Sequence, residues 1–188
     1  THPAGRRLYR RFGMHPEWHL SSTAVPDVGL TAARLGTHLT ARPVEVDEVI
    51  GLDRAVTHRD RLVDLEYEVD ADTGAAGEIL ALYDSGLARP VGYGVLVTHR
   101  PWDPDPYRAR LGPIVLAEPE LAAPAFGALL GAAAARGVGS VVTWIPSEHP
   151  GRLVLEAAGA IETGRDLVMS SEAGLLDARR YFPAPGTA

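Results

Sequence analysis

Apolar positions in the second half of the chain alternate between strand-like runs and helical patterns. Residues 111–116 and 140–145 form two short apolar runs, and the Ala/Leu/Gly-rich stretch 121–135 between them predicts a long helix. A shorter helix over 152–158 ends at Gly159. Such a strand–helix–strand crossover places the start of a helix beside the end of a strand, where backbone N–H groups can hold an anion. A βαβ unit that binds nothing has the same pattern.

The first half predicts shorter elements of both kinds. Leu8, Tyr9 and Phe12 lie at helical spacing and Gly13 follows as a stop, so a helix ends here and leads into a strand over 17–22. The small residues, Pro and Gly of 23–36 predict a linker with one short helical turn at most. Further strands are predicted over 37–44 (weak), 78–83, 90–99 and 165–171, and further helices over 46–57 and 61–71. A turn over 74–77, a surface loop over 101–107 and a tail over 172–188 with a mobile end complete the chain. A bulge is expected at the glycines of 91–97.

One segment near the start echoes one near the end. Residues 7–14 align with residues 153–160, so that Tyr9 corresponds to Leu155 and Gly13 to Gly159. In both places a helix closes at glycine and a strand with small hydroxyl residues follows. The echo predicts that residues 1–22 are the tail of an earlier copy of the same fold, and Thr1 in place of Met suggests a trimmed or numbered fragment.

Composition narrows the class of protein. The chain has 188 residues, of which 46% are hydrophobic and 22% charged, enough for one globular domain with a substantial core. Its net charge of −6 disfavours nucleic acid as the main partner. No apolar run is long enough to span a membrane and no signal peptide is evident, so a cytoplasmic location is predicted. The absence of cysteine excludes disulfides, thiolate metal sites and a Cys nucleophile.

Four groups of residues, in their order and spacing, carry a family resemblance. They are Arg42-Pro43 with Asp47, Asp53 and the segment 57–61; the strand residues 91–94; the segment 112–115 leading to 118–120 and the long helix; and residues 145–149 before the helix that closes at Gly159. This pattern resembles the GNAT superfamily of acyl-CoA-dependent N-acyltransferases, and more closely the second half of its tandem-repeat members. The resemblance implies an α/β (α+β) fold with a central mixed, mostly antiparallel sheet flanked by helices. It assigns 1–22 to a preceding repeat, 23–36 to a linker, 37–171 to the GNAT-like domain and 172–188 to a tail.

The resemblance also implies acetyl-CoA as co-substrate. In the family, a strand corresponding to Ile114, Val115 and Leu116 parts from its neighbour and pairs with the pantetheine arm. The turn into the next helix normally reads Arg/Gln-x-x-Gly-x-Gly/Ala and holds the pyrophosphate. Here the motif positions are Ala122, Ala125 and Gly127, with Phe126 between the last two. The side-chain donor and the first glycine are lost, and Pro124 removes one N–H. A helix start that is merely packed is the alternative.

Catalytic candidates follow from the same resemblance. In the family, a Tyr four residues before the final glycine of the last helix often protonates the leaving thiolate. Leu155 holds that position in the full domain, whereas Tyr9 holds it in the preceding copy. His149 and Ser147 are placed to orient the thioester or to relay a proton, with helix capping as the alternative for both. Glu118, Glu66 and Glu68 are candidates for the base that deprotonates the amine, and solvated carboxylates are the simpler interpretation. We predict no metal, since Pro16 and Trp18 disfavour a helix that would bring His15 and His19 together.

The leading hypothesis is the transfer of an acetyl group from acetyl-CoA to an amine, carried by a small molecule or a protein, by direct attack. The alternative is a catalytically silent GNAT-like module that packs on an active repeat or mediates dimerisation. A nucleic-acid-binding module fits poorly, because no stripe of interleaved basic and aromatic residues is present.

Overall fold

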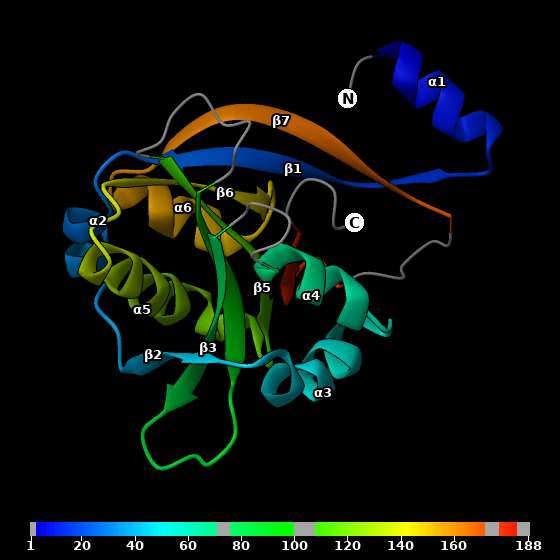
Figure 1. The fold of residues 1–188 in the computed structure, drawn as a ribbon. Helices are drawn as coiled ribbons and strands as arrows, with labels where there is room; N and C mark the ends of the chain where they lie inside the picture. The colour runs from blue at the N-terminus through cyan, green and yellow to red at the C-terminus, as the bar shows by residue number, and fades with distance from the viewer. Residues whose placement is uncertain (1–2, 71–75, 100–107, 172–176, 184–188) are drawn as a thin grey trace.

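The structure is a computed structural model that describes residues 3–70, 76–99, 108–171 and 177–183 (Figure 1). The helices are α1 (Pro3–Arg11), α2 (Val28–Leu35), α3 (Val46–Thr57), α4 (Leu62–Val69), the short 3-10 turn η2 (Pro119–Leu121), α5 (Ala122–Ala135) and α6 (Pro150–Ala157). The strands are β1 (His15–Val25), β2 (Leu39–Val44), β3 (Ala76–Asp84), β4 (Gly92–His99), β5 (Arg108–Leu116), β6 (Ser140–Pro146), β7 (Ile161–Ser170) and β8 (Tyr181–Phe182).

The strands form one mixed sheet. Seven of them lie in the order β2-β3-β4-β5-β6-β1-β7, and β8 pairs with β5. Neighbours in this order are antiparallel except β5 and β6, which are parallel and are joined through α5, the crossover that parallel neighbours need. The expected α/β fold with a mixed, mostly antiparallel sheet flanked by helices is confirmed.

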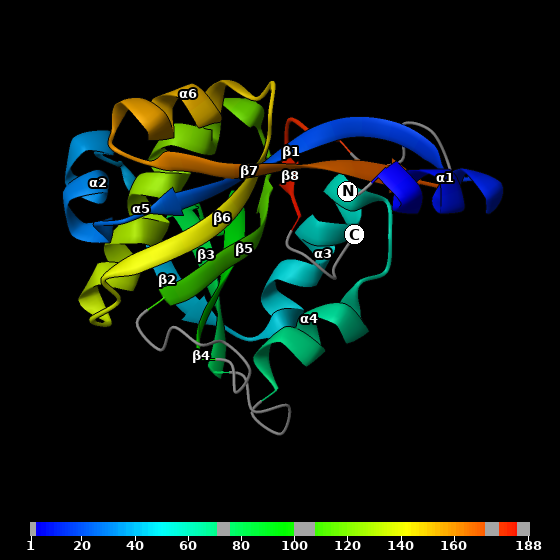
Figure 2. The same cartoon turned by 90° about the horizontal axis from the view of Figure 1, so that it is seen from above.

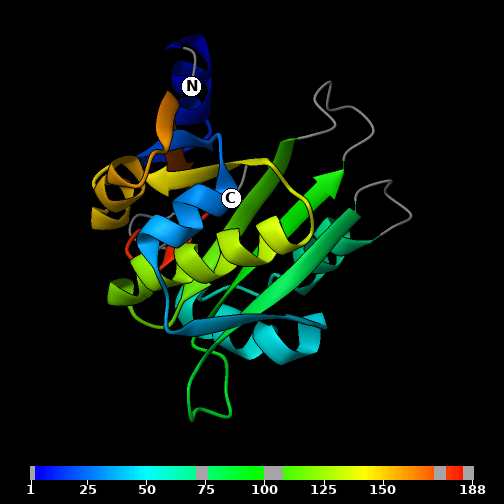
Figure 3. The ribbon, with the colours of Figure 1, turned by 90° about the vertical axis from the view of Figure 1, so that its left-hand side faces the viewer.

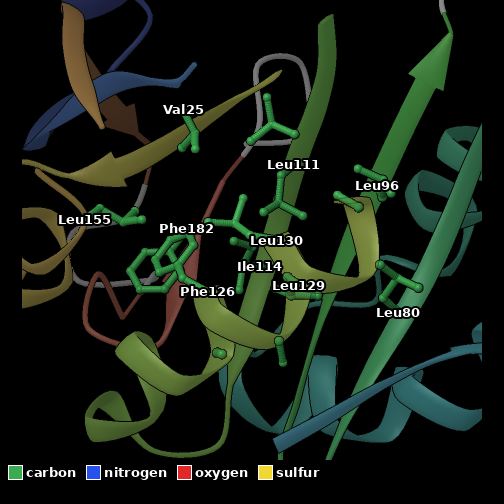
Figure 4. Close-up of a cluster of buried hydrophobic side chains, with 14 of the residues drawn as sticks. Val25, Leu80, Leu96, Leu111, Ile114, Phe126, Leu129, Leu130, Leu155 and Phe182 are labelled. Atoms are coloured by element: carbon green, nitrogen blue, oxygen red, sulfur yellow. The ribbon is translucent and has the colours of Figure 1, made fainter. Parts of the chain in front are cut away.

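Helices cover both faces of the sheet, so that the sheet separates two apolar cores. α2, α5 and α6 lie on one face, and α3 and α4 lie on the other (Figures 1 and 3). In the larger core, Phe126 and Leu129 of α5 pack with Leu96 and Ile114 of the strands (Figure 4). α5 is apolar on nearly all sides because it lies between the sheet, α2 and α6.

β1 and β7 form a long antiparallel pair that reaches beyond the rest of the sheet. β1 pairs with β6 only from Leu20 onward, whereas its pairing with β7 begins at His15. α1 lies at the outer end of this pair, away from α5 and α6 (Figures 1 and 2). A strand from the N-terminal end of the chain therefore enters the sheet between β6 and β7.

β5 and β6 part from each other along their length. They pair over Arg108–Arg110 of β5 and 140–142 of β6, and no further pairing between them is present in the described residues. The register between β4 and β5 shifts between Gly94 and Leu96, where β5 holds one extra residue near Gly112. Gly112 has a φ of 140°, which favours glycine. A bulge of this kind bends its strand, which accounts for the divergence.

Some sequence predictions differ from the structure. Residues 23–36 are not a linker, because they contain the end of β1 and the two-turn helix α2, which begins at Asp27 with a hydrogen bond from the Leu30 N–H. The predicted tail is also partly wrong, because 177–183 form a turn and a buried strand. The bulge expected at the glycines of 91–97 lies instead on the partner strand β5, near Gly112. Of the turn expected at 74–77, residues 76 and 77 belong to β3 and the other two lie outside the described residues, as do the loop at 101–107 and the end of the tail at 184–188. The other predicted elements are confirmed within a few residues.

Candidate functional site

The slot between the diverging ends of β5 and β6 is occupied by β8. Val115 pairs with Tyr181 and Ile114 with Phe182 in antiparallel register, and the Leu116 N–H donates to the Arg180 carbonyl at 2.8 Å. Tyr181 and Phe182 are each 1% exposed. Their side chains enter opposite cores, since successive residues of a strand point to opposite faces. The predicted divergence of these strands is therefore present, and the chain itself fills the space.

The three predicted arm-binding residues, Ile114, Val115 and Leu116, lie on β5 at this slot. All three are buried. On one side they pair with β4, and on the other side they contact β8 or the residue before it. Their backbone edge is the one that would meet an extended ligand, and in this structure it meets Arg180, Tyr181 and Phe182.

The predicted pyrophosphate positions at the start of α5 are closely packed. Ala122, Ala125, Phe126 and Gly127 are all buried. A Cβ atom on Gly127 would overlap the Gly36 carbonyl oxygen at the end of α2. Pro124 accepts a hydrogen bond from Thr37 through its carbonyl, at 2.7 Å. These residues pack against the α2–β2 turn, and their role in holding a pyrophosphate stays a prediction.

His149 caps α6 and holds the segment before β8. Its Nδ1 accepts from the Gly151 N–H at 2.9 Å, so the neutral ring carries its proton on Nε2, which donates to the Arg179 carbonyl at 3.0 Å. The ring also lies edge-on to Phe182. Burial lowers the pKa of His149 below its usual value of 6.5, against the opposing effect of the bond to Arg179. Both ring nitrogens are engaged in hydrogen bonds, of which the one at Nδ1 caps α6, and the predicted catalytic role of His149 stays a prediction.

Ser147, in the turn after β6, begins a chain of side-chain hydrogen bonds that reaches β1 and β7. Its Oγ lies 2.9 Å from Ser21 Oγ on β1, and Ser21 in turn donates to Glu162 Oε2 on β7 at 3.1 Å. Since Ser21 donates to the carboxylate, Ser147 donates to Ser21. Hydrogen bonding from Arg165 is the main cause that lowers the pKa of Glu162, so this carboxylate is a weak base. Ser147 is partly exposed, and its proposed catalytic role stays a prediction.

Tyr9 lies apart from His149 and Ser147. It belongs to α1 at the outer end of the β1–β7 pair, and its side chain is 42% exposed. Figures 1 and 2 both place α1 away from α6 and from the slot. Leu155, which aligns with Tyr9, is 0% exposed and packs in the larger core (Figure 4). The structure does not assemble the three predicted catalytic residues into one site.

A buried polar network on the α3–α4 side of β5 was not predicted as a unit. Asp53 of α3 accepts hydrogen bonds from Tyr93 Oη, Thr57 Oγ1 and Arg61 Nη1, and the Arg61 guanidinium lies 4.8 Å from the centre of the Tyr181 ring. Burial, followed by the charge of Asp53, raises the pKa of Tyr93 well above 10, so its hydroxyl stays protonated. In the sequence, Asp53 and the segment 57–61 were noted as part of the family resemblance. Their spacing does not reveal that they form a buried hydrogen-bond network.

The three carboxylates predicted as candidate bases, Glu66, Glu68 and Glu118, lie in different parts of the structure. Glu68 is buried and forms an ion pair with Arg110 of β5. Glu66 lines a cavity of about 730 Å³ between α3, α4 and the β2–β3 edge, together with Glu45, Glu48 and Glu78. Glu118 precedes η2. The role of these three carboxylates as a base stays a prediction.

The described residues contain neither a metal-binding cluster nor a membrane-spanning helix. No group of three or more His, Cys, Asp or Glu side chains is arranged to hold a metal ion there. No helix in the described part of the chain is both long and apolar enough to cross a membrane.

The lowered pKa of His149 predicts a specific dependence of stability on pH. Between the lowered folded pKa and the unfolded value of about 6.5, only the unfolded chain binds the proton, so the free energy of unfolding falls as pH falls through this window. The slope is at most about 1.4 kcal/mol per pH unit. His149→Asn keeps an acceptor and a donor but does not titrate. Urea unfolding of both proteins from pH 7.5 to 5.0 should give a smaller slope for the variant, and equal slopes would contradict the assignment.

Similarity to known proteins is found in the structure and not in the sequence. No protein-family model matches the chain, and no curated protein matches it by sequence. Among solved structures, a putative acetyltransferase from Pyrococcus horikoshii matches with a TM-score of 0.66 and 16% identity over 100% of this chain and 58% of that one. A GCN5-related N-acetyltransferase from Anabaena variabilis matches with a TM-score of 0.60 and 18% identity over 89% of this chain and 43% of that one.

A third structure agrees with these two. The GCN5-related N-acetyltransferase from Sphaerobacter thermophilus has a TM-score of 0.54 and 15% identity, over 93% of this chain and 58% of its own. The chain thus spans roughly half the length of the structures it matches. At these identities the likeness concerns the fold, and the fold of this chain is that of the GCN5-related N-acetyltransferases.

Proposed function

We propose that this chain is a non-catalytic GNAT-fold module of a larger N-acyltransferase and that, as folded, it does not bind acetyl-CoA. The observation that carries the proposal is the presence of β8 in the slot between β5 and β6. An extended acyl-CoA arm would need the same backbone edge at Val115 and Leu116 that pairs with Tyr181 and bonds to Arg180.

Two other features support a silent domain. The position from which a tyrosine would protonate a leaving thiolate holds Leu155, which packs in the larger core and has no proton to give. The helix start that would hold a pyrophosphate is covered by the α2–β2 turn, where Gly127 lies against Gly36. Binding and proton transfer are therefore both impaired at the places where the fold would supply them.

The α1 segment supports a second repeat as the partner. Leu8, Tyr9 and Phe12 are 51%, 42% and 75% exposed. The aligned helix α6 instead buries Leu155 against α5 and the sheet. In this proposal α1 closes a preceding GNAT-fold repeat, from which β1 continues into the sheet of this domain. The preceding repeat covers the apolar side of α1 and uses Tyr9 as the acid for acetyl transfer to a small-molecule or protein amine.

A second candidate is that this domain itself transfers acetyl from acetyl-CoA to an amine by direct attack. The specific observation in its favour is the divergence of β5 and β6 after Arg110 and Val142, which is the opening that an acyl-CoA arm requires. Ser147, partly exposed at the end of β6, would then lie near the thioester.

Calorimetric titration distinguishes the two candidates. With acetyl-CoA or CoA up to about 1 mM, the silent module should give no heat of binding beyond that of adenosine 3′,5′-bisphosphate, which lacks the arm and serves as the matched control. A dissociation constant in the micromolar range for acetyl-CoA, absent with the bisphosphate, would overturn the proposal and favour the second candidate. The next measurement would then be acetyl transfer to a panel of amines.

A further inference from the structure

We propose that the segment 179–182 acts as an internal competitor for the slot, so that β8, rather than the loss of the binding edge, keeps an acyl-CoA arm out. This inference rests on the proposed function and gives its cause. It predicts that the β5 edge becomes able to pair with an extended ligand whenever β8 leaves it.

The first argument is the way in which β8 occupies the slot. It lies antiparallel to β5 and uses the same backbone edge that a β-strand-like ligand would use. The Leu116 N–H has its acceptor, the Arg180 carbonyl, on this segment. With β8 removed, the Leu116 N–H would lack its partner, which disfavours an empty slot and favours a replacement strand.

The second argument is that β8 is held by contacts separate from those of the rest of the sheet. The turn before it depends on Asp177, whose Oδ1 accepts from the Arg179 N–H at 2.9 Å and whose Oδ2 bonds to Arg180 Nε at 2.7 Å. His149 bonds to the Arg179 carbonyl. The opposite edge of β5 stays paired with β4, and the Ala117 N–H beyond its end donates to the Val91 carbonyl at 2.8 Å.

Two neighbouring amides report on the two edges independently. The Leu116 N–H points to β8, and the Ala117 N–H points to the residue before β4. Their hydrogen exchange in the full chain, measured by NMR under native conditions, reports local opening at each edge. We expect the Leu116 amide to exchange faster than the Ala117 amide. Equal exchange rates of the two amides, in wild type and in the variants below, would overturn the inference, because β8 would then open only with the whole domain.

The variant Asp177→Ala weakens the turn without removing a core side chain. It should speed exchange of Leu116 by about tenfold, the size expected for losing a capping carboxylate, and leave Ala117 unchanged. The matched control is Asp27→Ala, which removes an equivalent bond, from the Leu30 N–H at 2.8 Å, at the start of α2. The control should change neither amide relative to the other.

Ligand binding then separates this inference from the proposed function. The probes are acetyl-CoA and S-acetylpantetheine, titrated into wild type, Asp177→Ala and Asp27→Ala. Both statements stand if Asp177→Ala gives measurable binding whereas wild type and Asp27→Ala give none over the same range of ligand concentration. If no protein binds although Leu116 exchanges faster, the inference fails and the silent module stands. If wild type binds as tightly as Asp177→Ala, both fail.

Discussion

Replacing Asp53 by alanine is expected to lower the free energy of unfolding by about 3–5 kcal/mol, the loss typical of breaking a buried ion pair. Arg61 is 2% exposed, and its Nε and Nη2 atoms have no hydrogen-bond partner among the described residues. Without Asp53, its nearest carboxylate there would be Asp64, at 3.9 Å. The Tyr93 hydroxyl would also lose its acceptor. Urea denaturation followed by circular dichroism measures the change.

A paired replacement tests the cause of this loss. Asp53→Leu combined with Arg61→Met removes both charges, and it should cost less than Asp53→Ala because no uncompensated charge remains buried. Asp60→Ala serves as the control on an exposed pair, that with Arg54, and should shift the denaturation midpoint little. A loss below about 1 kcal/mol for Asp53→Ala would mean that Arg61 finds solvent or another partner.

Replacing Phe182 by alanine is expected to cost about 3–5 kcal/mol as well, because it leaves a cavity in the larger core. The Phe182 ring lies 5.9 Å from that of Phe126 (Figure 4). It lies 4.8 Å from the His149 ring. Phe12→Ala is the control of the same chemistry on a side chain that is 75% exposed, and it should change stability little.

The Phe182 result also decides whether the C-terminal segment belongs to the core. Equal, small effects at Phe182 and Phe12 would mean that β8 contributes little to folding, contrary to its burial. A large effect at Phe182 is compatible with local opening, because global stability and the opening of one edge are separate quantities. The Asp177→Ala exchange experiment measures the second quantity.

The candidate site was only partly predictable. The resemblance pointed to Val115 and to the divergence of its strand from β6, and the structure shows that divergence. The occupant was not predictable, because a two-residue strand such as β8 has no periodicity of its own and gains its conformation from pairing with β5. Gly127 was not predictable for a related reason. The sequence does not distinguish a glycine that approaches a phosphate from one that, as here, packs against the backbone of Gly36.

What the sequence by itself determined is most of the local elements, because helical spacing and alternation act within a few residues of each other. The helix α2 and the strand β8 are the exceptions. Helix α3 over Val46–Thr57 and the strand–α5–strand crossover were predicted with nearly correct bounds. Only the tertiary structure decided that β1 enters the sheet between β6 and β7, and that 177–183 close the slot beside β5. These outcomes join residues more than sixty positions apart, and their stability comes from backbone pairing and burial that exist only once the sheet has formed.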